Sequence, residues 1–432
     1  MMASISLPAR RRILGYRQRG MTLTRREILA GLGAAAAHGA MAPAIKAAAG
    51  FPRKDDFAIP AGTAYLNAAM IHPMPRVAVE AIARGMQQRV TAATVPSFAG
   101  GGAKPLPKDT FAALINAKPS EIAYVPNTST GENLVVSGLG LDRDVRGNVV
   151  TDALHFEGAL MHLQELKKKG LEVRVAKATA DGRIDMKDLE RLVDTQTRLV
   201  EVSSVASFNG FQHDLKAVCD LAHAHGSYVY ADIVQSAGAV PIDVRAIGLD
   251  FAACSGFKWL MADFGLGFLY AREDLLDRVV QRTQVGYYSG SVDTHDSPLD
   301  PEHATTPLVW QLGKSASNYF EAGSIGGNAA GAFAYSASLT YLQQLGVANI
   351  EAHRQPLLRR LEQELPRLGY PLLTPRGSTS PIITFGTKDG AVVEKKLASG
   401  KVAARVSKYW LRFSPSVYND MKDVEQAIAA LS

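Results

Sequence analysis

A lysine stands between two aromatic residues in the stretch Ser255-Gly256-Phe257-Lys258-Trp259-Leu260, directly after an apolar run. A surface lysine needs no such neighbours, and an ammonium group buried without a partner is costly. Desolvation lowers the pKa of a lysine, so that its neutral amine becomes nucleophilic and can form a Schiff base with a carbonyl compound. We therefore interpret Lys258 as a catalytic residue.

Other side chains that can do chemistry follow the ends of predicted strands. Asp232 and Gln235 follow one strand, and His155 follows another. The segment 127–133 (Asn-Thr-Ser-Thr-Gly-Glu-Asn) opens a predicted helix after a third strand. Ligands of doubly wound sheets bind at the carboxyl ends of the strands, so we expect all these groups to meet Lys258 at one edge.

Each feature alone also fits a cap, a turn or a structural histidine, but together they favour one ligand. A carboxylate can hold a pyridine nitrogen protonated, which makes the ring an electron sink. An imidazole can stack on that ring, an amide can contact a phenolic oxygen, and a helix N-terminus favours a phosphate. The ligand with all these features is pyridoxal 5′-phosphate (PLP).

The helices and strands predicted around these residues indicate an α/β fold. Short apolar runs alternate with helical patterns, and several runs are apolar at every position, as in strands covered on both faces. The predicted strands are 121–125, 148–152, 171–176, 197–205, 227–232, 249–255 and 266–271. We predict a mostly parallel seven-stranded sheet in a large domain (residues 50–329), a polar loop at 281–306, and a small α+β domain (residues 330–432).

The first 49 residues differ from the rest of the chain. They hold eight basic residues and one acidic residue, which accounts for the formal net charge of +6, so the charge gives no argument for a nucleic-acid partner. Arg25 and Arg26 precede a short Gly/Ala-rich apolar stretch, a pattern that resembles a bacterial twin-arginine signal peptide. This predicts export by the twin-arginine machinery to the periplasm or outside, with Met1 or Met21 as the start. No apolar span is long enough for a stable membrane helix.

Seven segments in order resemble the class V aminotransferase family of fold-type I PLP enzymes, which includes cysteine desulfurases, kynureninase and isopenicillin N epimerase. They are 65–75, 127–135, 152–160, 230–244, 254–260, 320–324 and 411–419. The resemblance implies a fold-type I large domain, PLP as the cofactor, and a homodimer with shared active sites.

The same resemblance implies roles for individual residues. Lys258 is the Schiff-base lysine, Asp232 the partner of the pyridine nitrogen, Gln235 the contact of the phenolic oxygen, and His155 the ring that stacks on the cofactor. The implied phosphate contacts are Thr128, Ser129, Ser255 and, in the neighbouring subunit's site, Ser324. Arg412 is implied to bind the substrate carboxylate, and Asn67 to lie near the substrate.

Two departures from the family pattern bear on the reaction. Phe257 stands where many members have a histidine before the lysine, and the segment 401–415 has no cysteine where desulfurases carry a persulfide. We therefore expect an amino-acid-processing enzyme of the aminotransferase or epimerase type, with a kynureninase-like or C–S lyase as the alternative, and we exclude a persulfide-type cysteine desulfurase. A nucleotide-binding oxidoreductase is disfavoured because no strand leads into G-x-G-x-x-G. A catalytically silent binding protein is disfavoured by the joint presence of Lys258, Asp232 and Arg412.

Overall fold

The structure is a computed structural model that describes residues 50–91, 106–286, 289–292, 310–323 and 328–432. The predicted signal peptide and most of the polar loop at 281–306 lie outside the described residues. Within the part that the structure describes, no helix is both long enough and apolar enough to cross a bilayer.

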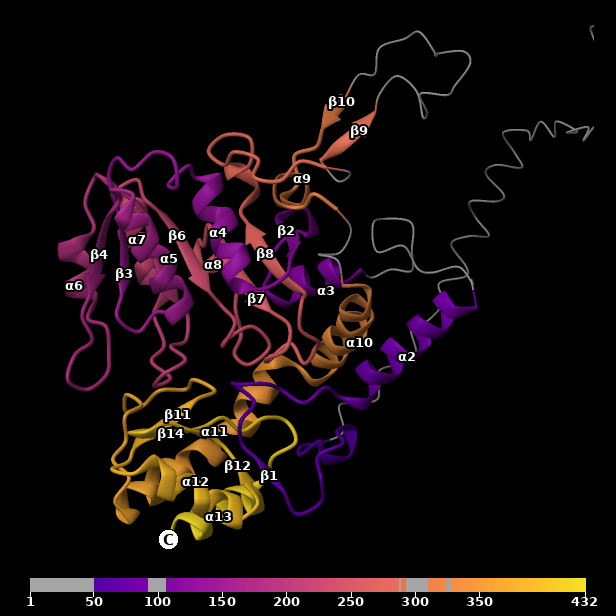
Figure 1. The fold of residues 1–432 in the computed structure, drawn as a ribbon, viewed down its shortest axis with the longest axis vertical. Coiled ribbons are helices and arrows are strands. Elements are labelled where there is room, and N and C mark those ends of the chain that lie inside the picture. The colour runs from indigo at the N-terminus through magenta and orange to yellow at the C-terminus, as the bar shows by residue number, and fades with distance from the viewer. Residues whose placement is uncertain (1–49, 92–105, 287–288, 293–309, 324–327) are drawn as a thin grey trace, which may run out of the picture. The chain divides into compact units, whose positions relative to one another are not determined.

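A seven-stranded sheet forms the centre of the large domain (Figure 1). Its strands lie in the order β2-β8-β7-β6-β5-β3-β4, and β8 is antiparallel to both of its neighbours while the others run parallel. The bounds are β2 (Ile122–Val125), β3 (Asn148–Asp152), β4 (Glu172–Ala176), β5 (Thr197–Ser203), β6 (Tyr228–Asp232), β7 (Phe251–Ser255) and β8 (Gly267–Ala271). All seven predicted strands are present, and the predicted fold class is confirmed.

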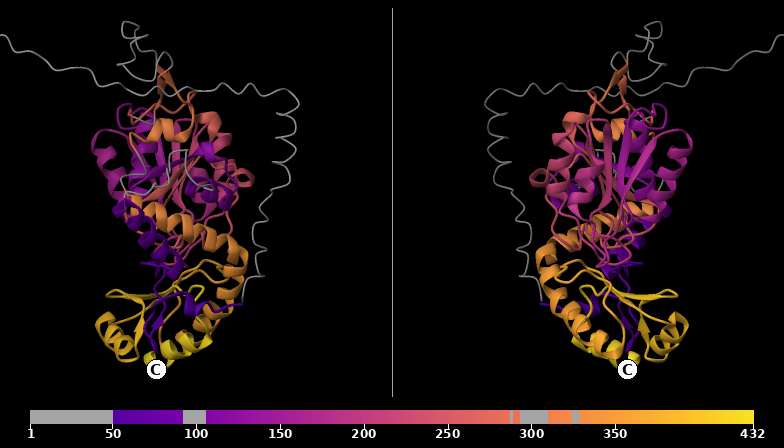
Figure 2. Two further views of the ribbon diagram at one scale, coloured as in Figure 1. Left: turned by 90° about the vertical axis from the view of Figure 1, so that its right-hand side faces the viewer. Right: turned by 90° about the vertical axis from the view of Figure 1, so that its left-hand side faces the viewer.

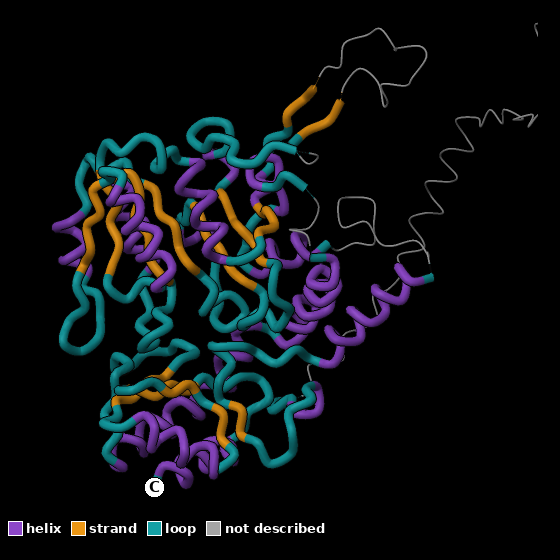
Figure 3. Tube along the Cα trace, in the orientation of Figure 1, coloured by secondary structure: helices purple, strands orange, loops and turns teal. Residues whose placement is uncertain are grey.

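Helices cover both faces of this sheet (Figure 3). On one face, α4 (Thr128–Gly138) and α5 (Glu157–Lys168) pack against alternate strand residues such as Val149. On the other face the next residue, Val150, packs with α6 (Met186–Leu192), α7 (Leu215–Ala224) and α8 (Val244–Ile247). Burial on both faces is the reason why the strand sequences are apolar at successive positions.

The C-terminal residues form a smaller α+β layer that lies together in all views (Figures 1 and 2). Its three-stranded sheet has the order β11-β14-β13, and a hydrophobic cluster packs it against helices. The elements are α11 (Val347–Glu364), β11 (Ile383–Gly386), α12 (Gly390–Ser399), β13 (Arg405–Val406), β14 (Trp410–Phe413) and α13 (Met421–Leu431). An early segment joins this layer, because β1 (Ala64–Tyr65) pairs in parallel with β12 (Val402–Ala403). The predicted domain boundary at residue 330 stays a prediction.

The remaining elements surround these two layers. Helix α10 packs along α2 and α3. Two short strands, β9 and β10, pair in antiparallel fashion on either side of residues 293–309. The bounds are α2 (Arg76–Val90), α3 (Pro107–Leu114), β9 (Gly290–Val292), β10 (Trp310–Leu312), α9 (Ala316–Phe320) and α10 (Ala329–Leu345), with short 3₁₀ turns at Lys54–Asp56, Pro119–Glu121, Glu273–Leu275 and Leu365–Leu368.

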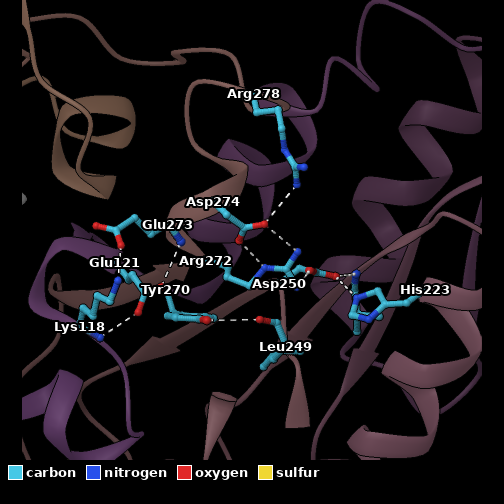
Figure 4. A network of polar contacts seen from close by, with 11 residues as sticks. Lys118, Glu121, His223, Leu249, Asp250, Tyr270, Arg272, Glu273, Asp274 and Arg278 are labelled. Carbon is cyan, nitrogen blue, oxygen red and sulfur yellow. Dashed lines mark hydrogen bonds and ion pairs between the residues drawn. The ribbon is translucent and has the colours of Figure 1, made fainter. Parts of the chain in front are cut away.

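A buried carboxylate anchors the start of β7 (Figure 4). Asp250 accepts hydrogen bonds of 2.8 Å from the backbone N–H of Val229 and from His223 Nε2, and it forms an ion pair of 2.8 Å with Arg272. Since a buried charge needs partners, this network ties β6, α7 and the end of β8 together. It fixes the strands whose opposite ends carry the candidate site.

Candidate active site

The ends of three parallel strands bring the predicted residues to one edge of the sheet. Ser203, the last residue of β5, is in register with Asp232, the last residue of β6, and Asp232 is in register with Ala253 of β7. The polypeptide leaves each strand at this edge and enters a loop that carries functional side chains. The grouping predicted from the strand ends is therefore present.

Helix α4 begins at the same edge and is tied to the end of β7. The backbone N–H of Thr128 donates to Ser255 Oγ at 2.9 Å, and the backbone N–H of Ser255 donates to Thr128 Oγ1 at 3.0 Å. Asn127 caps the helix by accepting from the N–H of Thr130 at 2.8 Å. Two predicted phosphate contacts thus lie side by side at a helix N-terminus, where N–H groups and the helix dipole favour an anion.

Lys258 lies in the tight turn after β7. Its residue keeps some contact with solvent, but burial of the amine lowers its pKa to about 8, against the opposing effect of the Asp232 charge. Gly256 is required nearby because a Cβ there would lie 1.8 Å from the hydroxyl oxygen of Tyr335. The turn therefore presents a lysine whose neutral form is accessible near neutral pH.

Asp232 and His155 are both buried beside this lysine. Burial raises the pKa of Asp232, while the N–H of Val234 and the charges of His155 and Lys258 oppose that effect. His155 Nδ1 lies 2.9 Å from Ser203 Oγ, and its Nε2 has no hydrogen-bond partner among the described residues. A buried imidazole with one free nitrogen is available to a ligand.

The side-chain amide of Gln235 makes two hydrogen bonds. Its Nε2 donates to the backbone carbonyl of Ala69 at 3.0 Å, and its Oε1 accepts from Trp259 Nε1 at 2.9 Å. One hydrogen of the amide nitrogen is left over, so Gln235 can still donate to a ligand oxygen as predicted.

The predicted substrate residues come from the C-terminal layer and from the segment that joins it. Arg412 of β14 donates from Nη1 to the backbone carbonyl of Ser207 at 2.5 Å, and its buried Nε has no partner among the described residues. Burial lowers the pKa of Arg412 to about 10. Asn67 forms an isolated parallel β-bridge with Ser414, the residue directly after β14, and its Oδ1 is also buried without a partner in the described part.

Two predicted phosphate contacts are less closely tied to this group. Ser129 lies in the first turn of α4, and its Oγ lies 3.5 Å from where a Cβ on Gly158 would be. It thus faces the start of α5, and in the described structure it makes no hydrogen bond to Ser255 or Lys258. Ser324 lies outside the described residues, so its predicted place in a neighbouring subunit's site stays a prediction.

Two aromatic side chains lie beside the lysine, and of these only Phe257 was singled out from the sequence. Lys258 Nζ lies 5.9 Å from the ring centroid of Phe156 and 5.8 Å from that of Phe257. Phe257 stacks on Phe264 with 4.2 Å between centroids. The only available sequence signal for Phe156 was its position directly after His155, at the N-cap of α5.

The free groups of this site match the parts of PLP. The partly desolvated amine of Lys258 suits an aldehyde, and the buried carboxylate of Asp232 suits a protonated pyridine nitrogen. His155 Nε2 is unpartnered, and the N-terminus of α4 beside Ser255 suits a phosphate. The residues present therefore fit the cofactor.

Comparison with known proteins agrees with this fit. Residues 107–426 match the class-V aminotransferase family, which is a family of PLP enzymes. The chain belongs to this family, and its cofactor is PLP. The predicted family, cofactor and enzymatic nature are confirmed.

Individual relatives give more detail. A cysteine desulfurase of Haloferax volcanii is 33% identical over 239 residues, which cover 55% of this chain and 52% of that protein. A probable cysteine desulfurase of Methanothermobacter thermautotrophicus is 33% identical over 257 residues, or 59% of each chain. The matches thus span only about half to three fifths of these relatives. The apo structure of a cysteine desulfurase from Thermococcus onnurineus NA1 has a TM-score of 0.74 at 24% identity and covers 89% of this chain and 98% of that one, which shows the fold alone.

These relatives correct the predicted reaction. The preference for an aminotransferase or epimerase, and the exclusion of a persulfide-type cysteine desulfurase, are wrong, because the relatives that match by sequence are cysteine desulfurases. The exclusion relied on one missing cysteine in the segment 401–415. The absence of a cysteine in one segment does not bear on the residues that fit PLP and the substrate carboxylate.

Proposed function

We propose that this protein is a PLP-dependent enzyme that removes sulfur from L-cysteine, as a cysteine desulfurase does. The observation that carries the proposal is the amine of Lys258, which is partly desolvated and close enough to Asp232 and to Arg412 for both charges to act on its pKa. This arrangement brings a proton-transferring group near a cofactor anchor and a carboxylate anchor. The names of the similar proteins support cysteine as the substrate.

Each residue has a task in this scheme. When bound, PLP supplies an electron sink for negative charge at the substrate Cα. The unpartnered Nε of Arg412 and its neighbouring nitrogens bind the substrate carboxylate, which orients the Cα towards Lys258. The neutral amine of Lys258 accepts the Cα proton and can return one. Burial of this amine keeps its pKa low, and the ring centroids of Phe156 and Phe257 lie 5.9 Å and 5.8 Å from it.

The sulfur acceptor is a separate question from the cleavage of the C–S bond. The chain holds two cysteines, Cys219 and Cys254, and both side chains are buried. Burial raises the pKa of Cys219 to about 12 and that of Cys254 further still, so thiolates at these positions are scarce. An assay should therefore include a small added thiol, and the variants Cys219→Ala and Cys254→Ala report whether either residue takes part.

The direct test is incubation of the PLP-loaded protein with L-cysteine and a thiol. We expect sulfide and alanine in equal amounts, with two thiols oxidised to one disulfide for each cysteine consumed, and neither product from Lys258→Ala. Release of pyruvate and ammonia in place of alanine would contradict a desulfurase, as would turnover that requires a keto-acid acceptor. L-Alanine as the substrate is the control for sulfide that does not come from the reaction.

We also propose that the enzyme acts as a homodimer in which Ser324 contacts the phosphate in the neighbouring subunit. Dimers are common among PLP enzymes of this family, which supports the proposal. Mixing the inactive variants Lys258→Ala and Ser324→Ala would then restore part of the activity by forming one intact site per mixed dimer. A mixture that stays inactive while exchanging subunits contradicts the shared site.

Export is the last part of the proposal. The twin arginine at Arg25 and Arg26 and the short apolar stretch after it support transport of the folded protein by the twin-arginine machinery. Such transport lets the cofactor bind before export. Cell fractionation should find the protein outside the cytoplasm, and Arg25→Lys with Arg26→Lys should retain it inside. A protein found only in the cytoplasm, with residues 1–49 still attached, would contradict export.

A further inference from the structure

An arginine of the C-terminal layer is fully buried and forms no ion pair with a carboxylate of the described residues. Arg354 on α11 is 0% exposed, and only its Nη2 has a hydrogen bond, which it donates to the backbone carbonyl of Ala239 at 2.9 Å. Its Nε and Nη1 have no partner among the described residues. A buried guanidinium of this kind is costly, so some other interaction must offset the cost.

The ring of Trp259 supplies that interaction. The guanidinium carbon of Arg354 lies 5.5 Å from the centroid of this ring, within the range of a cation–π contact. Trp259 is itself 1% exposed and packs with Ala239 and other small residues of the same cluster. Trp259 directly follows Lys258, so Arg354 links α11 to the turn that carries the lysine.

Trp259 in turn fixes the orientation of an amide. The indole nitrogen can only donate a hydrogen bond, so its partner at 2.9 Å must be the oxygen of Gln235. The amide nitrogen of Gln235 then faces the carbonyl of Ala69, which can only accept. Both contacts select the same orientation, which leaves the second N–H of Gln235 as a donor.

We propose that Trp259 and Arg354 are positioning residues that make Gln235 a hydrogen-bond donor towards the phenolic oxygen of bound PLP. Trp259 sets the amide orientation through its N–H, and Arg354 holds the indole in place from the C-terminal layer. With the amide reversed, its oxygen would face the phenolate and repel it. This inference rests on the cofactor binding of the proposed function, and it is independent of which amino acid the enzyme uses.

The test is a pH titration of the visible absorbance of the PLP-loaded protein without substrate. Trp259→Phe keeps the aromatic ring and removes the N–H. Because a donor to the phenolate stabilises the deprotonated chromophore, we expect this variant to raise the pKa of the absorbance band by about one unit. Gln235→Leu should give a similar rise, and Trp259→Phe should add nothing to it in the double variant.

Arg354→Met tests the second link, and Arg359→Met on the exposed side of the same helix is its matched control. We expect Arg354→Met to shift the titration in the same direction by a smaller amount, and Arg359→Met to leave it unchanged. Trp410→Phe is the control for the loss of an indole elsewhere. Thermal unfolding of every variant checks that the fold is retained.

The outcomes separate this inference from the proposed function. A wild-type protein that shows no visible band with PLP overturns the cofactor binding itself. If the pKa of the absorbance band rises in Gln235→Leu but not in a folded Trp259→Phe variant, the positioning role of Trp259 is wrong while the cofactor binding still stands. A merely structural role would lower the unfolding temperature of Trp259→Phe without moving the titration, and that result also counts against the proposal.

Discussion

Ser255 Oγ accepts a hydrogen bond of 2.9 Å from the backbone N–H of Thr128, a residue 127 positions earlier in the chain. The Thr128 hydroxyl in turn accepts from the N–H of Ser255 at 3.0 Å. This reciprocal pair joins the end of β7 to the start of α4. It therefore holds the helix N-terminus beside the turn that carries Lys258.

Removal of the Ser255 hydroxyl should weaken the binding of PLP. Ser255→Ala loses two hydrogen bonds to Thr128 of α4 and one possible contact to the phosphate, so we expect the Kd for PLP to rise by about tenfold. Fluorescence titration of the cofactor-free protein measures it. Ser137→Ala, on the same helix but bonded to Asp142, is the control and should bind PLP normally.

The rate at which cofactor-free protein takes up PLP should depend on pH. Burial lowers the pKa of Lys258 to about 8, and only the neutral amine reacts with an aldehyde. The uptake rate should therefore rise as the pH passes from about 7 to about 9 and then level off. Stopped-flow absorbance measures this rate, and a midpoint near 10, as for an exposed lysine, would contradict the proposed environment of Lys258.

Arg412 should act on substrate binding more than on cofactor binding. Arg412→Lys keeps the charge but loses the planar pair of donors, so we expect KM for the amino acid to rise by tenfold or more, or about 1.4 kcal/mol. The absorbance of bound PLP should stay unchanged. Arg405→Lys, on the neighbouring strand β13, is the control, and an equal effect in both variants would show a general charge effect instead of a specific contact.

A buried acid behind the site should make stability depend on pH. Glu201 on β5 is 0% exposed with both oxygens unpartnered in the described part, and burial together with the charge of Glu132 raises its pKa well above the usual value. The folded state therefore keeps a proton that the unfolded chain loses above about pH 4.3. Stability from this group is full below that pH and falls as the pH rises, by up to about 1.4 kcal/mol per pH unit.

Glu201→Gln removes this titration. We expect its free energy of unfolding, measured by urea denaturation, to fall less between pH 6 and pH 8 than that of the unchanged protein. The exposed residue Glu165 provides the matched control, since Glu165→Gln should leave the pH dependence as it was. A slope that is the same in all three proteins would mean that Glu201 is ionised in the fold.

Much of the fold was visible in the sequence because both faces of the sheet are covered. That burial makes the strands continuous apolar runs, and the site residues then follow from the rule that ligands bind at strand ends. Asp232, His155 and Lys258 were found in this way. The long-range pairing of β1 with β12 left no pattern, since each strand has only two residues.

Two further features of the site could not be predicted from the sequence because they depend on contacts between residues far apart in the chain. The need for glycine at position 256 depends on Tyr335, a residue on a distant helix, and the orientation of Gln235 depends on which atoms of Trp259 face it. Neither relation is encoded locally. The reaction was mispredicted because a single absent cysteine was given more weight than the many residues shared with cysteine desulfurases.

The hydrogen bond from the Ser414 hydroxyl to the backbone carbonyl of Leu66 joins residues that are 348 positions apart in the chain. During synthesis, Asn67 and the segment around it cannot pair with the residues after β14 until β14 has left the ribosome. The substrate side of the pocket is therefore completed late. The large sheet, whose strands all precede residue 272, has no such delay. We expect the nascent chain to form its cofactor-binding surface first and to bind substrate only after release. Ribosome-bound chains would then have a cofactor site without a complete substrate site.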